Sequence, residues 1–216
     1  MPYDPMPRDE EPIRLFKNKY LEALTHVHPA LVPVIWAPVL LYHLALGVSN
    51  APASGLSAGH IALGFAIGVV VWSFTEYMVH RFVFHFEPKN PPPWLDRLIF
   101  LFHGIHHAQP WDPTRLVMPP AASVPLALLF YGLFGRVLGG WMGAPQWIDV
   151  LFSGFVAGYI AYDMLHYATH HLPVQRGPLK FIKKYHMLHH YKTPNERYGV
   201  SSPAWDMVFS TLPEAE

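Results

Sequence analysis

The stretch IDVLFSGFVAGYIAYDMLHYATHH, residues 148–171, combines two patterns in one segment. Residues 148–168 are predominantly apolar, and at a rise of about 1.5 Å per residue a helix of this length crosses the roughly 30 Å hydrocarbon core of a bilayer. Three histidines stand at its end, at positions 166, 170 and 171. The segment therefore predicts a membrane-spanning helix whose last turns carry a histidine cluster.

Three other segments repeat the apolar half of this pattern. Residues 31–48, 61–79 and 121–142 are also long enough and apolar enough to span a bilayer. Only 14% of the residues are charged, whereas a soluble globular domain has about 25%. We therefore predict an all-α integral membrane protein with four transmembrane helices. In the second helix, Gly64 and Gly68 have the small-xxx-small spacing that lets another helix approach closely.

Charge and cysteine content exclude several classes of function. Lys and Arg together number 15, as do Asp and Glu, so the chain lacks the basic surplus of a nucleic-acid-binding protein, and no nucleic-acid partner is expected. The sequence has no cysteine, which excludes disulfides, cysteine zinc sites and iron–sulfur clusters bound by cysteine. Any metal must therefore be bound by nitrogen and oxygen atoms.

Lysines and arginines predict the orientation in the membrane. They gather before the first helix, between the second and third, and after the fourth, and Arg136 alone falls elsewhere. With four crossings these three segments share one side, and the positive-inside rule makes that side the cytoplasm. We therefore expect a multi-pass protein with both termini in the cytoplasm. Its parts are an N-terminal cytoplasmic or interfacial segment at 1–29 and a membrane domain at 30–216, whose cytoplasmic cap comprises 80–118 and 169–216.

The N-terminal segment contains an amphipathic pattern. In IRLFKNKYLEAL, residues 13–24, five apolar positions recur at helical spacing, namely Ile13, Phe16, Tyr20, Leu21 and Leu24. A proline at position 12 precedes them and is suited to the first position of a helix. The pattern predicts a helix over 13–24 that lies along the membrane surface or packs on the rest of the protein.

Eleven of the 15 histidines fall in four clusters. The clusters are HRFVFH (His80, His85), HGIHH (His103, His106, His107), HYATHH (His166, His170, His171) and HMLHH (His186, His189, His190). Each lies at or beyond the predicted cytoplasmic end of the second or fourth helix, so four distant segments are expected to converge on one layer. Because helical residues three and four apart share a face, an HxxHH motif presents two or three imidazoles to one point.

Metal binding explains these clusters better than the alternatives. Histidine is the commonest metal ligand, and it binds in its neutral form, which dominates at cytoplasmic pH. A storage tract would be a continuous low-complexity run, not four spaced motifs at helix ends. A divalent ion takes about three to five imidazoles, so about ten histidines predict two ions, and imidazole does not choose between zinc, copper, iron and nickel. The isolated histidines are interpreted as surface or hydrogen-bonded residues: His26, His28, His43 and His60.

Two carboxylates share helix faces with the clusters. Glu76 is four residues before His80, and Asp163 is three residues before His166. Because an acid inside a membrane helix is costly, a functional role is the first interpretation of both. Each is expected to accept a ring N–H from a metal ligand and so to fix its tautomer. Direct ligation and a plain position at the aqueous interface are the alternatives.

The motifs HRFVFH and HGIHH, a histidine pair at the end of a later helix, and HMLHH follow one another between Trp72 and the C-terminus. In this order they resemble the histidine set of the integral-membrane fatty acid hydroxylase superfamily, which includes sterol desaturases. Within that superfamily, EYMVHRFVFH, DMLHYATHH and HHYKTPNERYGVSSPAWDMVFSTLP are most similar to fatty acid 2-hydroxylases. The resemblance is close over roughly the last two-thirds of the chain and covers the first helix by topology only.

The resemblance implies a lipid-metabolising oxidoreductase with a dinuclear non-haem iron site, which uses O2 to hydroxylate the acyl chain of a fatty acid or sphingolipid at the 2-position. Zinc can occupy such sites in isolated proteins. The family's ten metal-binding histidines correspond here to His80, His85, His103, His106, His107, His166, His170, His186, His189 and His190. The other histidine of the HH pair, His171, is expected to lie behind the ligands.

The resemblance also implies a separate electron donor. Many eukaryotic 2-hydroxylases carry a fused cytochrome b5-type domain, and this sequence lacks its haem-binding motif. A cytochrome b5-like or ferredoxin-type partner is therefore expected. The basic run KFIKKYH, residues 180–186, suits an acidic donor, although positive-inside charge alone also explains it.

Two alternatives to the acyl hydroxylase remain open at this point. One is a hydroxylase or desaturase of the same superfamily that acts on a sterol or a carotenoid. The other is a membrane metal-handling protein. The ligands of a transporter should lie near the bilayer midplane, where these helices are apolar.

Overall fold

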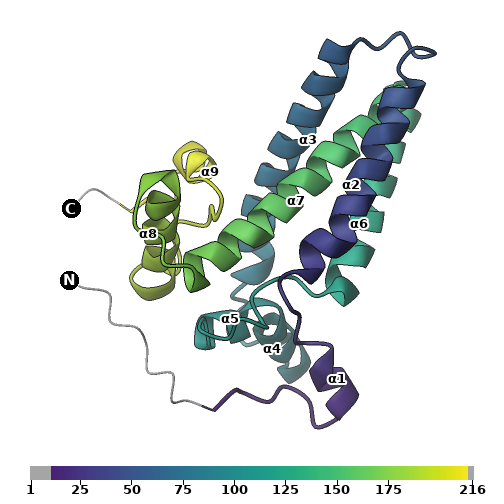
Figure 1. The fold of residues 1–216 in the computed structure, drawn as a ribbon. Helices are drawn as coiled ribbons and strands as arrows, with labels where there is room; N and C mark the ends of the chain where they lie inside the picture. The colour runs from purple at the N-terminus through teal and green to yellow at the C-terminus, as the bar shows by residue number, and fades with distance from the viewer. Residues whose placement is uncertain (1–10, 214–216) are drawn as a thin grey trace. The chain divides into compact units, whose positions relative to one another are not determined.

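The computed structural model describes residues 11–213, and every regular element in this range is a helix, as predicted (Figure 1). The elements are α1 (Lys19–Ala23), α2 (Leu31–Asn50), α3 (Ala58–Val79), the π-helical turn η1 (His80–Phe84), α4 (Pro93–Ile99), the π-helical turn η2 (Phe100–Gly104), α5 (Ile105–Ala108), α6 (Pro120–Phe134), the π-helical η3 (Gly135–Trp141), the 3₁₀ turn η4 (Pro145–Trp147), α7 (Ile148–His171), α8 (Gly177–Tyr191) and α9 (Ala204–Val208).

These elements form two compact units. The bundle unit comprises Ala30–Glu76 and Met118–Met164, and it holds α2, α6 and most of α3 and α7. The histidine unit comprises the described residues up to Pro29, Tyr77–Val117 and the residues from Leu165 onward. Because α3 and α7 contribute to both, each unit is assembled from segments that are distant in sequence.

Four helical segments are long and apolar enough to cross a membrane: Leu31–Asn50, Ala58–Phe84, Pro120–Trp141 and Pro145–His171. The prediction of four spans is confirmed. Its largest boundary difference is in the second span, which continues through η1 to Phe84. Because peptide groups in hydrocarbon must be hydrogen-bonded within the protein, uninterrupted helices are the structure such segments adopt. The chain is a multi-pass membrane protein.

The central helix of the bundle unit is α7. Of the residues in its apolar stretch 56% are buried, against 11–22% in the other three spans. Its Tyr159 packs edge-on against Trp36 of α2 and Trp72 of α3, with ring centroids 5.5 and 5.1 Å apart. Its Phe155 contacts Trp72 and Phe130 of α6, at 5.0 and 4.7 Å. Aromatic pairs in these geometries stabilise a bundle beyond the area they bury.

Glycines allow α3 and α7 to approach at the backbone. A Cβ atom on Gly68 would lie 2.1 Å from the carbonyl oxygen of Leu151, and one on Gly154 would lie 2.0 Å from that of Phe65. A Cβ on Gly64 would also meet side chains of the last span, at 2.9–3.0 Å. The predicted close approach at Gly64 and Gly68 is therefore confirmed.

Replacing Gly154 by alanine is expected to destabilise the bundle by about 3 kcal/mol or more, because the new methyl group would overlap a backbone carbonyl that cannot move independently. Gly132 of α6 is the matched control, since a Cβ there meets no atom within 4 Å. Thermal unfolding of the detergent-solubilised variants measures the difference. Equal stabilities of Gly154→Ala and Gly132→Ala would contradict the close packing.

A polar cluster joins three helices of the bundle unit. In α2, His43 Nδ1 lies 2.7 Å from Asp149 Oδ1 of α7, and the hydroxyl of Tyr131 in α6 donates to the same oxygen at 3.3 Å. The ring of Phe152 packs edge-on against His43 at 4.8 Å. This cluster agrees with the interpretation of His43 as a hydrogen-bonded residue outside the metal site.

The N-terminal helix is shorter than the sequence predicted. The amphipathic pattern predicted a helix over 13–24, but α1 begins only after Asn18, whose side chain caps its first turn. The carboxylate of Glu22 accepts the backbone N–H groups of Leu15 and Phe16, at 3.0 and 2.7 Å. These bonds hold the preceding residues in a non-helical conformation, so the prediction is wrong for the first half of the segment.

Candidate metal centre

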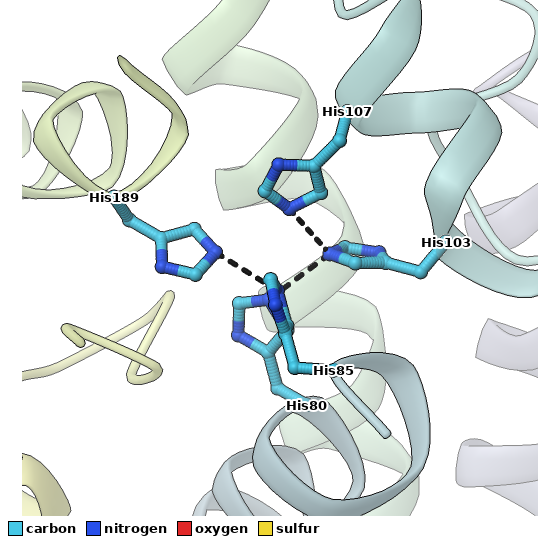
Figure 2. A group of neighbouring side chains, drawn as sticks. All are labelled: His80, His85, His103, His107 and His189. Atoms are coloured by element: carbon cyan, nitrogen blue, oxygen red, sulfur yellow. Dashed lines mark hydrogen bonds between the residues drawn. The ribbon is translucent and has the colours of Figure 1, made fainter. Parts of the chain in front are cut away.

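The structure gathers ten histidines into two groups of five, both inside the histidine unit. The first group is His80, His85, His103, His107 and His189, and the second is His106, His166, His170, His186 and His190. Within each group one ring nitrogen from every residue lies within 4.8 Å of the others. Figure 2 shows the five rings of the first group pointing toward a common centre from η1, the η2–α5 segment and α8.

Each HxxHH motif is divided between the two groups. In HGIHH, the i,i+4 pair His103 and His107 joins the first group, while His106 joins the second. In HMLHH the assignment is reversed, because the i,i+4 pair joins the second group and His189 joins the first. At about 100° per residue, residue i+4 lies about 40° from residue i around the helix axis, and residue i+3 lies about 60° from it on the other side. One motif therefore presents two imidazoles to one group and a single imidazole to the other.

A π-helical turn explains the spacing of HRFVFH. In an α-helix, residues five apart point about 140° away from each other. In η1 the N–H of His85 donates to the carbonyl of His80 at 3.1 Å, the i→i+5 bond of a π-turn. The wider turn brings the two rings to the same side, with centroids 4.9 Å apart. The π-turn that follows α3 thus places both histidines in the first group.

The separations between ring nitrogens fit ligands around an ion. Seven Nε2–Nε2 distances within the two groups lie between 2.9 and 3.1 Å. Two nitrogens bound at right angles to one ion, each about 2.1 Å from it, are separated by about 3.0 Å, whereas tetrahedral ligands would be about 3.4 Å apart. The distances therefore suit a five- or six-coordinate ion in each group.

Backbone carbonyls fix two of the rings. His80 Nδ1 donates to the carbonyl of Tyr198, and His189 Nδ1 donates to that of Glu196 at 2.7 Å. A carbonyl can only accept, so the proton of each ring stays on Nδ1 and the lone pair on Nε2 faces the centre of the group. A carboxylate was expected from the sequence as the partner of such a ring, whereas for His80 and His189 the partner of Nδ1 is a peptide carbonyl.

The two carbonyls belong to a loop that Asp206 organises. The carboxylate of Asp206 is fully buried and accepts the N–H groups of Tyr198 and Gly199, both at 2.8 Å, and the hydroxyl of Thr211 at 2.7 Å. A Cβ on Gly199 would lie 2.1 Å from the carbonyl oxygen of Ser202, so the loop closes tightly there. No pattern in the sequence indicated this role of Asp206.

The network extends from the same loop to the start of the first motif. Thr211 Oγ1 lies 2.9 Å from the hydroxyl of Tyr77, which accepts a hydrogen bond from Arg81 at 2.9 Å. Tyr77 is fully buried and stacks on Phe209 with ring centroids 5.3 Å apart. Asp206 therefore supports the first histidine group from two directions, through the loop and through η1.

Burial keeps the imidazoles neutral. Desolvation, reinforced by neighbouring histidines, lowers the pKa of His85 and of His107 to about 3. The same causes, in the same order, hold the pKa of His103, His106 and His186 well below the ordinary value of about 6.5. Neutral imidazole is the form that coordinates a metal ion.

The two groups are neighbours. His107 of the first and His190 of the second stack with ring centroids 4.2 Å apart. His103 and His106 also lie close across the boundary, at 5.5 Å. The alternating assignment of the HxxHH motifs therefore produces adjacent centres, which fits a dinuclear site.

The remaining predicted residues lie outside both groups. His171, the last residue of α7, packs against Tyr167 at 4.9 Å. Glu76 and Asp163 are buried in the bundle unit, where the N–H of Met118 donates to Asp163 at 3.3 Å. Neither carboxylate is a member of a five-histidine group.

The N-terminal segment holds the HGIHH motif in place. Gln109, which follows α5, is 2% exposed, and its amide accepts the N–H of Ile13 at 2.9 Å and donates to the carbonyl of Glu11 at 3.0 Å. Arg115 donates to the carbonyl of Ile13. The backbone also pairs directly, from Val27 N–H to the carbonyl of Thr114 at 2.7 Å. These bonds fix the segment that carries three of the ten histidines.

The chain resembles known membrane hydroxylases over most of its length. A family model described as fatty acid hydroxylase matches residues 65–211. A dihydroceramide fatty acyl 2-hydroxylase of Arabidopsis thaliana is 36% identical over 211 residues, which cover 98% of this chain and 84% of that protein. A ceramide very long chain fatty acid hydroxylase of Saccharomyces cerevisiae is 39% identical over 198 residues, and the match covers 91% of this chain and 48% of that one.

A fatty acid 2-hydroxylase of Mus musculus is 32% identical over 216 residues, covering 93% of this chain and 57% of the mouse protein. Among solved structures, that of full-length scs7p, in which only the hydroxylase domain is visible, matches with a TM-score of 0.81 and 38% identity. The match covers 93% of this chain and 72% of that one. The chain therefore belongs to the fatty acid hydroxylase family.

Proposed function

We propose that this protein hydroxylates the acyl chain of a fatty acid or ceramide-type lipid at the carbon beside the carbonyl, using O2 and external electrons. The observation that carries the proposal is the pair of adjacent five-histidine groups in a membrane protein of the fatty acid hydroxylase family. The names of the relatives supply the substrate class and the position, since they are called fatty acyl 2-hydroxylases and fatty acid 2-hydroxylases.

Two iron ions are the metals proposed for the two groups. All ten ligands offered are neutral nitrogens, which suit iron and zinc alike. Because the reaction requires electrons to be passed to O2, a redox-active metal is needed, and zinc would support binding but not turnover. The ten histidines named in the two groups are proposed as the ligands.

The chain's own residues position and shield this chemistry. Six of the ten rings are buried: His80, His103, His106, His166, His186 and His189. Neutral rings would leave the positive charge of bound ions uncompensated by ligand charge, and their burial would exclude bulk water from the coordinating nitrogens. Carbonyls that hold the Nδ1–H groups keep the lone pairs directed inward while a substrate binds.

Glu76 and Asp163 are proposed as supporting groups, and not as ligands. Both carboxylates are buried on helices that continue into histidine ligands, four residues before His80 and three before His166. Burying a carboxylate in a membrane helix costs free energy, so such a residue usually has a function. His171 is proposed to support the second group from behind, next to its neighbour His170 in α7.

The metal centre and both termini are proposed to face the cytoplasm. The distribution of lysine and arginine around the four spans supports this orientation. The proposed division of the chain is an interfacial segment at 1–29 and a membrane domain at 30–216, of which residues 1–10 and 214–216 lie outside the described structure.

A separate acidic electron donor is proposed to dock on α8. This helix carries His186, His189 and His190 toward the metal centre, and its exposed residues include Lys184 and Phe181, the latter 55% exposed. Exposed basic and apolar side chains on one helix suit a transient complex with an acidic protein. A donor bound there would lie on the same helix as three of the proposed ligands.

The function is tested by mass spectrometry of lipids from cells that express the wild-type chain or His189→Ala under ¹⁸O-labelled O2, with iron and an electron donor supplied. The expected result is one labelled oxygen on the carbon beside the acyl carbonyl, found only with the wild type. Label on a sterol or carotenoid would instead assign a different substrate. Unchanged acyl lipids with metal bound and donor present would contradict the proposal.

A further inference from the structure

An exposed groove lies between the N-terminal segment and α4 of the histidine unit. Its volume is about 450 Å³, within the range of small-ligand sites. The basic groove is defined by its lining residues, Arg14, Leu15, Phe16, Lys17, Asn18, Leu21 and Arg97. Among the described residues 11–213, the lining therefore contains three cations and no carboxylate, and it joins two segments that are far apart in the sequence.

Hydrogen bonds hold two of the cations in place. Arg14 donates from Nε to the carbonyl of Phe16 at 3.0 Å and from Nη2 to that of Lys17 at 2.8 Å. Arg97 donates from Nη2 to the carbonyl of Leu15 at 2.8 Å, and its guanidinium lies 5.5 Å from the centre of the Phe16 ring. These contacts use only some of the five donors of each guanidinium. Both cations are thus ordered before any anion binds, which reduces the entropic cost of binding.

The carboxylate of Glu22, in the same N-terminal segment, does not neutralise the groove. Burial opposes the ionisation of Glu22, but the N–H groups of Phe16 and Leu15 and the guanidinium of Arg115 outweigh that effect and lower its pKa. Glu22 and Arg115 form a direct ion pair inside the unit. The charge of Glu22 is therefore balanced internally, and the three groove cations remain available to an external anion.

Exposed apolar side chains lie on or beside α1 and α4, the two helices that contribute Leu21 and Arg97 to the groove lining, and we call them the apolar rim. Tyr20 and Leu24, in and beside α1, are 71% and 60% exposed, and Trp94 and Leu98 of α4 are 67% and 39% exposed. Cations that reach toward phosphates beside exposed Trp, Tyr and Leu side chains are typical of protein surfaces at the headgroup layer of a membrane. An acidic protein partner would match the cations but would leave this apolar rim without a counterpart.

The groove is close along the chain to the start of a membrane-spanning helix. The first span begins at Leu31, a short link after Leu24. The segment between them is fixed to the histidine unit by the backbone bond from Val27 to Thr114. A groove tied so closely to the start of a membrane helix lies within reach of lipid headgroups.

We propose that the basic groove binds the phosphate group of an anionic membrane phospholipid, while its apolar rim contacts the upper part of the acyl region. Arginine and phosphate form charge-assisted, often bidentate hydrogen bonds, and Lys17 supplies a third cation. The lipid acts as a ligand that anchors the N-terminal segment to the bilayer. The inference does not depend on the proposed reaction.

The test is a titration of the purified full-length protein in neutral detergent with short-chain phosphatidylglycerol, with short-chain phosphatidylcholine as the zwitterionic comparison. A lipid that binds the native state raises the melting temperature in a saturable manner. Phosphatidylglycerol is expected to do so, and phosphatidylcholine to have little effect. Lys17→Gln, which changes one exposed side chain, is expected to raise the half-saturating concentration roughly tenfold.

Arg14→Gln/Arg97→Gln is expected to abolish the response, and Lys19→Gln, a cation outside the groove lining, to leave it unchanged. Equal effects of the two lipids, or a wild-type response in both groove variants, would overturn the proposal. If the groove variants bind phosphatidylglycerol normally but need roughly tenfold more acidic donor protein for half-maximal turnover, the groove is a protein-docking surface and the lipid proposal is wrong.

Discussion

Replacing His186 by alanine is expected to reduce the metal content from two ions per chain to about one, and to slow hydroxylation by at least about 100-fold. His186 belongs to the second group, where its Nε2 lies 2.9 Å from that of His170 and 3.0 Å from that of His190. Loss of one outer hydrogen bond to a metal ligand already weakens affinity by about 10–100-fold, so loss of a ligand should have a larger effect. Metal analysis of the purified protein and the ¹⁸O₂ assay measure the two consequences.

The matched variants separate the two groups. His189→Ala should remove the ion of the first group, although it lies on the same helix as His186 and only three residues away. His60→Ala is the control, because that ring contacts Ser57 and Trp147 in the bundle unit and belongs to neither group. Two ions and full activity in either ligand variant would show that the assignment of that histidine is wrong.

Asp206→Asn is expected to destabilise the protein by about 3 kcal/mol and to weaken metal binding in the first group by about 10–100-fold. The substitution preserves the volume of the side chain but turns one acceptor into a donor. In the native protein both oxygens of Asp206 accept, one from Tyr198 and Thr211 and the other from Gly199. An amide would leave at least one buried N–H facing another donor, and the loop that holds His80 would shift.

If Asp206 positions the first group, Asp206→Asn should lose metal from that group only, whereas general misfolding would remove metal from both groups. Its loop supplies the carbonyls that hold His80 and His189, both of which belong to the first group. The variant should therefore retain about one ion per chain, in the second group. Asp96→Asn, an exposed carboxylate of α4, serves as the control. Equal loss of both ions from Asp206→Asn, or no loss at all, would contradict the role.

The membrane architecture could be predicted from the sequence because each span carries its own signal. A sufficiently long apolar run is stable in hydrocarbon as a helix. Segment 148–171 and the other three apolar runs could therefore be recognised as membrane helices from their sequence alone. Gly64 and Gly68 indicated close packing for a similar reason, since their spacing places two small residues on one helix face. The partner helix α7, in contrast, became known only from the structure.

The sequence predicted which ten histidines come together, but not which five form each group. Spacing indicated that HGIHH and HMLHH present several imidazoles, yet the assignment of His106 and His189 to the opposite group depends on where two helices meet. The five-residue spacing of HRFVFH departs from α-helical periodicity, and only the π-turn in η1 explains how both of its rings reach one group.

Long-range backbone bonds account for most of what the sequence could not indicate. The partners of His80 and His189 are peptide carbonyls, which leave no trace in side-chain composition. A buried carboxylate far along the chain, Asp206, fixes those carbonyls. In the N-terminal segment, the carboxylate of Glu22 accepts the N–H groups of Leu15 and Phe16, two residues that the amphipathic pattern predicted to be helical. In each case a polar group that satisfies the backbone overrides a local pattern.

Two iron ions per chain, one in each five-histidine group, should be visible by anomalous X-ray scattering at the iron edge from crystals of the chain loaded with iron. Two peaks per chain are expected. One should lie about 2.1 Å from the Nε2 atoms of His103 and His107, and the other at the same distance from those of His186 and His190. A single peak, or peaks away from both five-histidine groups, would contradict this prediction.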